Sequence, residues 1–460
     1  MLKLTFVGGA GTVTGSNFLV EGDKGRLLVD CGLEQGRDFS EEAMYAPFPY
    51  DVPSLDALVI THAHLDHIGR APKLMREGFK GKVYCTPPTK DLMDVMLYDS
   101  VAILTQEAEK HQLKPMYDED DIKAFMACVE SLDYHVEKEV APGLSVYLRN
   151  TGHILGSASV RVKDLAGGAA VALTGDIGGP SPYLTPWEPV TDADVLVMES
   201  VYGDRLHPNL ENRVPELRDT LKRAVARGGV ILMPAFSLER SQLMLYEISN
   251  LMDAGEIPKF PVFLDSPLAI AATRVYEKWG EKYFNPEAKQ ELVREHDIFK
   301  FPFLTMTESR NESMKIHEAP NPKMIMAGAG MSHGGRIGRW EQTYLPDDNT
   351  TLLIVGYQAP GSPGRLLQDK APHVRIDNQD VRVKAAVETL TSWSAHADRD
   401  GLLKFAEACL PSAKTIFVAL GEPSSQRFLA QRIHDFLGGN AVVPHADEVW
   451  EITKQGAKRL

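Results

Sequence analysis

Three histidines and an aspartate fall within residues 62–67, which read His-Ala-His-Leu-Asp-His. They follow the apolar run 57–60, so we expect a buried strand to end in a ligand-bearing turn and lead into helix-like residues 68–76. His62 and His64 are two residues apart and project to the same side of an extended backbone. Imidazole and carboxylate groups at this density suit one or two zinc ions. The alternative is a polar loop with scattered histidines, but such a loop has no need of so apolar a strand before it.

Two further candidate ligands, His153 and Asp176, stand where other apolar runs end. Glycines flank both of them, and glycine lets the backbone pass close to a crowded site. A lone histidine or aspartate at a strand end is usually structural, but here both accompany the histidine-rich turn. We therefore expect two adjacent metal sites, one made of His62, His64 and His153, the other of Asp66, His67 and a bridging Asp176. Spacing alone leaves this division open.

Strand and helix patterns alternate along the chain, which predicts an α/β protein. Hairpin signals at 18–30 and 159–174 favour mixed sheets in the first third. Apolar residues recur with helical spacing and predict helices at 214–226, 239–252, 402–409 and 424–436. The charge run 118–121 indicates a solvated helix start. A chain of 460 residues predicts two or three domains. No Pro- or Ser-rich linker is visible, so we expect a second domain to be inserted into the first.

Composition excludes several classes of protein. The net charge of −14 argues against non-specific coating of nucleic acid, although a local basic groove or a metal site can still contact phosphate. No apolar run long enough for a membrane span appears, and the N-terminus reads as a first strand and not as a secretory signal. The four scattered cysteines fit reduced thiols. We expect a cytoplasmic protein with no membrane partner.

These motifs resemble the metallo-β-lactamase superfamily, in which an early strand-terminal aspartate, HxHxDH, a later histidine and a bridging aspartate recur. Asp30 matches the first of these and is expected to orient a ligand. Four further segments resemble the β-CASP nuclease branch: 198–207, 330–336, 356–365 and 392–398. Within that branch, the chain is similar to bacterial and archaeal relatives of the endonuclease subunit of the pre-mRNA 3′-end cleavage factor. The resemblance implies an αββα metallo-β-lactamase domain at 1–198 and 390–460 and an inserted α/β β-CASP domain at 199–389.

The resemblance also implies a zinc-dependent nuclease that hydrolyses RNA, with two Zn²⁺ per chain and a metal-bound hydroxide as nucleophile. His396 is the implied general acid, and Glu199 holds its imidazole. Asp66 is expected to share in the catalysis. Implied substrate contacts are Ser394, Arg336 and Arg365. For each arginine, an ordinary ion pair is an equal alternative.

One departure concerns the second metal. RNA-directed relatives usually carry a histidine ligand just before Gly421-Glu422, whereas this chain has Leu420, which cannot coordinate. His445 lies downstream, and we do not expect it to substitute. Three alternatives follow: a DNA-directed β-CASP nuclease, a small-molecule metallohydrolase, and a non-catalytic RNA-binding partner. The resemblance is compatible with a homodimer.

Overall fold

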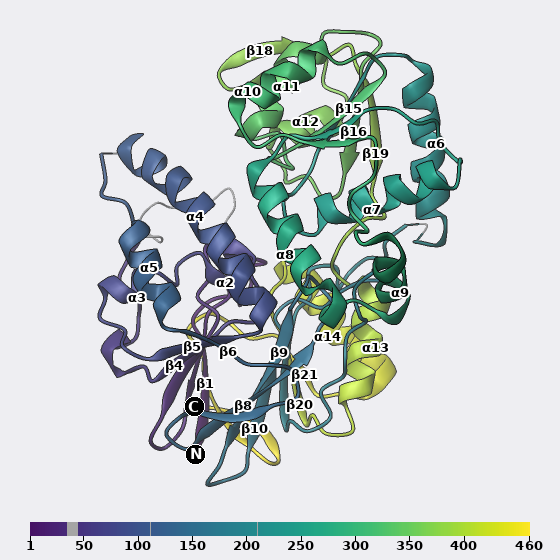
Figure 1. Ribbon diagram of the computed structural model, residues 1–460. Coiled ribbons are helices and arrows are strands. Elements are labelled where there is room, and N and C mark those ends of the chain that lie inside the picture. The colour runs from purple at the N-terminus through teal and green to yellow at the C-terminus, as the bar shows by residue number, and fades with distance from the viewer. Residues whose placement is uncertain (35–44, 111, 209) are drawn as a thin grey trace. The chain divides into compact units, whose positions relative to one another are not determined.

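The computed structural model describes residues 1–34, 45–110, 112–208 and 210–460 (Figure 1). It is a mixed α/β structure, as predicted. Contacts divide the chain into two units, residues Met1–Leu206 with His396–Leu460, and residues His207–Ala395. The exact limits of the two domains named above stay a prediction. No helix among the described residues is both long and apolar enough to cross a bilayer.

The first unit contains two sheets that pack face to face. One has the order β23-β22-β1-β2-β3-β4-β5-β6 and the other β21-β20-β11-β10-β9-β8-β7. Apolar side chains from both sheets form one core between them. The strands of the first sheet are β1 (Leu2–Phe6), β2 (Phe18–Glu21), β3 (Arg26–Val29), β4 (Ala57–Val59), β5 (Lys82–Cys85), β6 (Val129–Ser131), β22 (Val449–Thr453) and β23 (Gly456–Arg459). Those of the second are β7 (Glu137–Ala141), β8 (Leu144–Asn150), β9 (Ala158–Asp164), β10 (Ala170–Leu173), β11 (Val195–Met198), β20 (Thr415–Val418) and β21 (Ala441–Val442).

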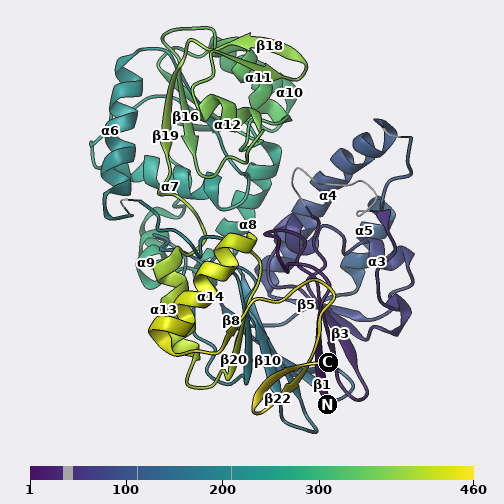
Figure 2. The ribbon, with the colours of Figure 1, turned by 180° about the vertical axis from the view of Figure 1, so that it is seen from behind.

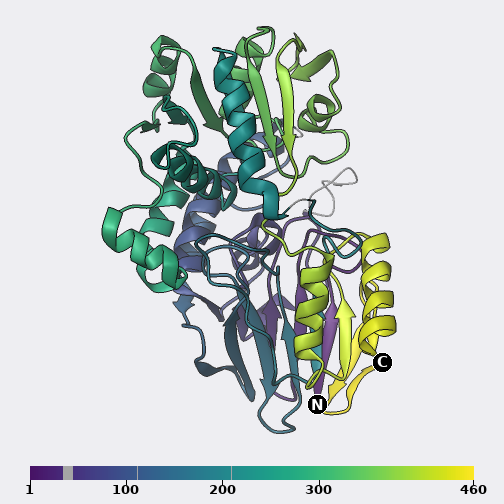
Figure 3. The same cartoon turned by 90° about the vertical axis from the view of Figure 1, so that its right-hand side faces the viewer.

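Helices cover the outer faces of these sheets. Figures 1 and 2 show α3 to α5 outside the first sheet and α13 and α14 outside the second, and Figure 3 shows α13 and α14 side by side. A second apolar core lies beneath α13 and α14. The helices are η1 (Val52–Ser54), α2 (Leu65–Ile68), α3 (Lys73–Arg76), α4 (Pro87–Lys110), α5 (Glu119–Ala127), α13 (Arg399–Cys409) and α14 (Pro423–Leu437).

The local predictions for this unit are mostly confirmed. Both hairpins form, as β2 with β3 and β9 with β10, and Asp118 caps α5 with its side chain. The continuous helix expected over 68–76 is wrong, because the structure has the short helices α2 and α3 in its place. Pro72 stands between them, and proline has no backbone N–H with which to continue a helix.

The second unit is built on one parallel sheet with the order β14-β13-β15-β12-β16-β19. Its central strands are buried along their whole length, as strands covered on both faces must be. Its strands are β12 (Val230–Pro234), β13 (Val262–Leu264), β14 (Leu304–Met306), β15 (Lys323–Ala327), β16 (Thr351–Val355) and β19 (Ala386–Leu390), with a separate hairpin β17 (His373–Ile376) and β18 (Gln379–Arg382). Its helices are η2 (Leu210–Asn212), α6 (Arg213–Ala226), α7 (Arg240–Asp253), α8 (Pro267–Tyr283), α9 (Pro286–Glu295), α10 (Arg310–Lys315), η3 (Ile316–Glu318), α11 (Gly335–Tyr344) and α12 (Pro363–Gln368).

A carboxyl group is buried inside this unit without a cation beside it. Glu341, on α11, is fully buried, and it accepts a hydrogen bond from the Ser332 hydroxyl at 2.6 Å. Its other oxygen, Oε2, has no hydrogen-bond partner among the described residues. Burial disfavours the charged form and raises the pKa of Glu341 to about 8. Glu341 is therefore protonated in the folded protein at neutral pH.

This burial predicts a pH-dependent stability. Between the ordinary pKa of glutamate and about pH 8, the unfolded chain loses a proton that the folded chain keeps, so the free energy of unfolding falls as pH rises. Glu341→Gln removes this group. The free energy of unfolding of the variant, relative to that of the original chain, is therefore expected to be a few kcal/mol higher at about pH 9 than at about pH 5. Thermal unfolding at both pH values tests this. The exposed Glu287→Gln is the control, and equal shifts for both variants would contradict the prediction.

Candidate metal centre

Three histidines and one carboxylate converge at one end of the first unit. His62 follows β4, His64 precedes α2, His153 follows β8 and Asp176 follows β10. The Nδ1 atom of His64 lies 3.1 Å from His62 Nε2 and 3.2 Å from His153 Nε2. The Oδ2 atom of Asp176 lies 3.3 Å from His62 Nε2 and 3.4 Å from His153 Nε2. All four donor atoms lie within 4.8 Å of one another.

This donor set fits a tetrahedral metal ion. Ligands about 2.0–2.1 Å from zinc are about 3.3 Å apart in that geometry, which matches the four separations of 3.1–3.4 Å given above. Burial keeps the pKa of His62 below its usual value, and it keeps those of His64 and His153 well below theirs. The three imidazoles are therefore neutral at pH 7, which is the form that coordinates a metal.

The other oxygen of Asp176 faces a second group of donors. Asp176 Oδ1 lies 3.4 Å from His67 Nε2, and Asp66 Oδ2 lies 3.9 Å from the same nitrogen. His67 Nε2 is buried and has no hydrogen-bond partner among the described residues. Burial opposes charge on this imidazole, but the carboxylates of Asp176 and Asp30 raise the pKa of His67 well above its usual value. The two oxygens of Asp176 thus point to the two proposed groups, as expected of a bridging carboxylate.

Asp30 holds this second group in place. Its Oδ2 lies 2.6 Å from His67 Nδ1 and accepts hydrogen bonds from the hydroxyls of Ser16 and Thr61, each at 2.9 Å. Its Oδ1 accepts from the Thr61 backbone N–H at 2.8 Å. Such a contact fixes the tautomer of a ligand histidine and its ring orientation. Sequence reasoning proposed this role for Asp30 but missed Thr61, whose hydroxyl is also 3.1 Å from His62 Nδ1.

A histidine–glutamate pair adjoins the cluster. Glu199 follows β11 and is fully buried, while His396 precedes α13 and forms an isolated bridge with Gly178. His396 Nδ1 lies 3.2 Å from Glu199 Oε2 and 4.0 Å from Asp176 Oδ2. Burial opposes charge on His396, but the Glu199 carboxylate outweighs it and raises the pKa of His396 to about 9. The imidazole is therefore protonated at neutral pH and can donate a proton.

Close approach of two loops requires glycine at position 178. A side-chain carbon placed there would lie 1.9 Å from the Gly152 carbonyl oxygen. The Gly178 N–H donates to the Thr151 carbonyl at 2.8 Å, so the loops that carry His153 and Asp176 are joined by their backbones. Any larger residue at position 178 would force these two candidate ligands apart.

The three candidate substrate contacts belong to the second unit and not to the unit that holds this cluster. Arg336 donates to the buried carboxylate of Asp265 at 2.6 Å and to the Thr307 carbonyl at 3.0 Å. These are the contacts of an ordinary ion pair, which was the alternative to a substrate contact. Arg365 forms an exposed pair with Asp369 at 2.9 Å. Ser394 is half-buried, two residues before His396 in the sequence. Their contact with substrate stays a prediction.

Leu420 contributes to the apolar core. It is 2% exposed and packs between the two sheets of the first unit. Its backbone N–H donates to the Gly9 carbonyl at 2.7 Å, and its carbonyl accepts from the Ser200 N–H at 3.1 Å. His445 is exposed and belongs to neither metal-binding group found among the described residues. The proposed second site of Asp66, His67 and Asp176 is likewise neither of these two groups, and position 420 adds no histidine to it.

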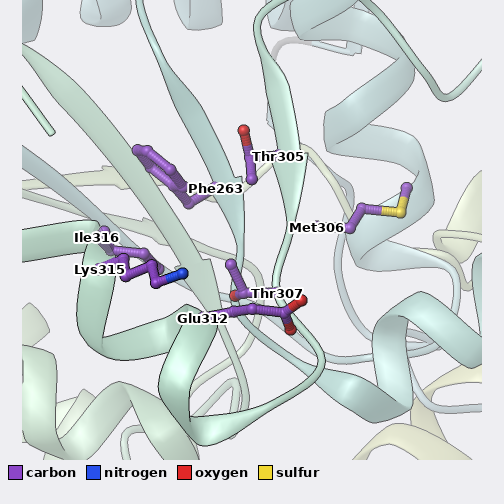
Figure 4. A pocket seen from close by; sticks show the side chains of 7 residues that line it. All are labelled: Phe263, Thr305, Met306, Thr307, Glu312, Lys315 and Ile316. Carbon is purple, nitrogen blue, oxygen red and sulfur yellow. The ribbon is translucent and has the colours of Figure 1, made fainter.

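A cavity of about 170 Å³ lies in the second unit beside the strands β13 and β14 and the helix α10 (Figure 4). Phe263 and Thr305 are cross-strand partners there, and Glu312 and Lys315 come from α10. The lining contains one carboxylate and no histidine or cysteine. It therefore offers no alternative to the histidine cluster as a metal centre.

Comparisons with known proteins match the chain along most of its length. Residues 10–126 match the metallo-β-lactamase superfamily, residues 241–367 the Beta-Casp domain, and residues 380–444 the Zn-dependent metallo-hydrolase RNA specificity domain. The chain is 33% identical over 408 residues to ribonuclease TTHA0252 of Thermus thermophilus, covering 87% of this chain and 90% of that protein. It is 31% identical over 458 residues to the transcription termination factor FttA of Methanocaldococcus jannaschii, covering 96% and 70%.

A solved structure shares the fold. A protein of unknown function from Enterococcus faecalis aligns with a TM-score of 0.59 at 12% identity, covering 98% of this chain and 99% of that one.

Proposed function

Because the chain belongs to the metallo-β-lactamase superfamily and to its β-CASP branch, we propose that it is a metal-dependent ribonuclease, a hydrolase that cuts phosphodiester bonds of RNA. The observation that carries this proposal is the cluster of His62, His64, His153 and Asp176 beside the His396–Glu199 pair. Two Zn²⁺ are the proposed cofactors. The ion at the first group is expected to bind more tightly than the ion at the second, because Leu420 supplies no ligand there.

Phosphodiester hydrolysis needs a nucleophile, neutralised phosphate charge and a proton for the leaving oxygen. Divalent ions bound in this centre would supply the first two, by lowering the pKa of water and by contacting phosphate oxygens. Asp66, whose carboxylate is the most exposed of the cluster at 22%, is proposed to accept a proton from an attacking water. His396 is proposed to protonate the leaving oxygen, and Glu199 to keep that imidazole charged and oriented.

Cleavage of end-labelled nucleic acid, together with elemental analysis of the purified protein, tests the proposal. Single-stranded RNA should be cut, a chelator should stop the reaction, and Zn²⁺ should restore it. Cleavage of DNA but not of RNA would mean that the substrate is DNA. If the metal-loaded protein leaves both polymers intact and hydrolyses thioesters or lactones, it is a small-molecule hydrolase and the proposal is wrong. A folded protein with almost no bound zinc would instead favour a non-catalytic RNA-binding partner.

A further inference from the structure

The parallel sheet of the second unit has a point at which its connections diverge. β12 and β15 are neighbours. The chain leaving β12 returns to the sheet as β13, on the β15 side, whereas the chain leaving β15 returns as β16, on the far side of β12. In open α/β sheets, ligands bind in the crevice outside the carboxyl ends of strands at such a point. The loops after β12, β15 and β16 are therefore the expected position of groups that recognise a ligand.

An aromatic ring is fixed over glycine at this crevice. Phe236, two residues after β12, lies against Gly330 in the loop after β15, where a side-chain carbon would come within 2.8 Å of the Phe236 ring. The Phe236 carbonyl accepts hydrogen bonds from the Ser241 N–H at 3.2 Å and from the Ser241 hydroxyl at 2.8 Å. The ring is nevertheless 38% exposed. It is positioned by backbone contacts while part of its surface faces solvent.

A second exposed aromatic side chain comes from the adjoining strand. Tyr357, two residues after β16, is 53% exposed. β16 pairs with β12, and a side-chain carbon at Gly356, the residue before Tyr357, would lie 3.6 Å from Nε of Arg240 in the segment after β12. Gln358, which is buried, donates from Nε2 to the Gly330 carbonyl at 3.0 Å. Phe236 and Gln358, the residue after Tyr357, thus contact the same glycine.

We propose that Phe236 and Tyr357 form a stacking platform for unpaired bases of single-stranded RNA, an inference that rests on the proposed ribonuclease function for its substrate. Single-stranded RNA is recognised largely by stacking of splayed bases on aromatic side chains. Such stacking tolerates every base, because each has a π-face, so it suits an enzyme that must hold strands of different sequence. Hydrogen bonds to the Phe236 and Gly330 carbonyls hold the backbone beneath the ring before RNA arrives, and less order then has to be imposed on binding.

Stopped-flow fluorescence anisotropy with a short labelled RNA tests the platform, since binding is then read before cleavage. Phe236→Leu and Tyr357→Leu should each weaken binding by about 5- to 150-fold, the range expected for loss of one stacked base. Phe436→Leu is the matched control, because Phe436 is 66% exposed on α14 in the other unit. Tyr357→Phe keeps the ring and should bind as the original chain does.

An RNA with abasic sugars separates stacking from a general disturbance of the fold. This RNA should bind Phe236→Leu and the original chain equally. Equal losses for abasic and ordinary RNA would overturn the platform, as would unchanged binding by both leucine variants. If Phe236→Leu fails to fold, the half-exposed Tyr357→Leu decides the matter alone. RNA that binds through these rings and stays uncut would refute the ribonuclease proposal but support the platform. RNA that is cleaved equally well without either ring would support the ribonuclease proposal but refute the platform.

Discussion

Asp176→Asn is expected to lower kcat/KM for RNA by about a thousandfold or more, because a bound metal ion supplies several kcal/mol of transition-state stabilisation. Asp176 faces His62 and His153 with one oxygen and His67 with the other, so both groups of donors depend on it. The asparagine amide is uncharged, and only its oxygen can bind a metal ion, because its nitrogen has no lone pair to offer. The variant should therefore lose zinc from both groups, with the larger loss where Leu420 already leaves a ligand missing.

Elemental analysis and RNA cleavage, measured on the same preparation, check this result. Asp51→Asn is a suitable control, because Asp51 lies in the same unit and its side chain is exposed. Circular dichroism of both variants separates loss of metal from loss of fold. Full zinc content and full activity in Asp176→Asn would remove Asp176 from the centre.

His396→Ala is expected to slow RNA cleavage by about 10²- to 10⁴-fold while most of the zinc remains bound. The reason is that the leaving oxygen of RNA is a poor leaving group without a proton, and His396 carries one at neutral pH. A phosphodiester with a nitrophenol leaving group needs no such proton. The variant should therefore retain far more activity toward bis(4-nitrophenyl) phosphate than toward RNA.

The comparison of the two substrates distinguishes a proton donor from a ligand. His396 also lies within metal-binding distance of Asp176 and Glu199, so a role as ligand is the competing explanation. Equal losses for both substrates, accompanied by loss of zinc, would establish that explanation. His434→Ala serves as control, because His434 is an exposed histidine of the same unit, at 73%.

Local sequence signals predicted the strands that carry the site, but only some of the pairings between strands. β4 lies where the apolar run 57–60 indicated, because burial in a sheet removes those apolar side chains from water. The pairing of β1 with β22 was not predicted, since nothing within either segment specifies a neighbour so distant in sequence. The same limit applies to Thr61, whose role depends on Asp30, a residue from another strand.

The candidate ligands were accessible to sequence reasoning because His153 and Asp176, each beside glycine at a strand end, accompany the dense run of histidines at 62–67. The convergence of His153 and Asp176 on the histidine-rich turn was expected, and their atoms do lie within ligand distance. The arginines were less predictable. Arg336 makes its contacts with Asp265 and Thr307, and no pattern around residue 336 distinguishes that ion pair from a phosphate contact.

The pairing of β1 with β22 also affects when the protein can become active. Leu2 pairs with Ile452, so the first sheet stays open during translation until the ribosome has released residues far downstream. His396 and β20 emerge late as well, whereas the inserted unit is complete by Ala395 and can fold earlier. A nascent chain shorter than 396 residues therefore lacks both the closed sheet and His396. Residues on which the proposed reaction depends thus join the site only after the inserted unit has been made.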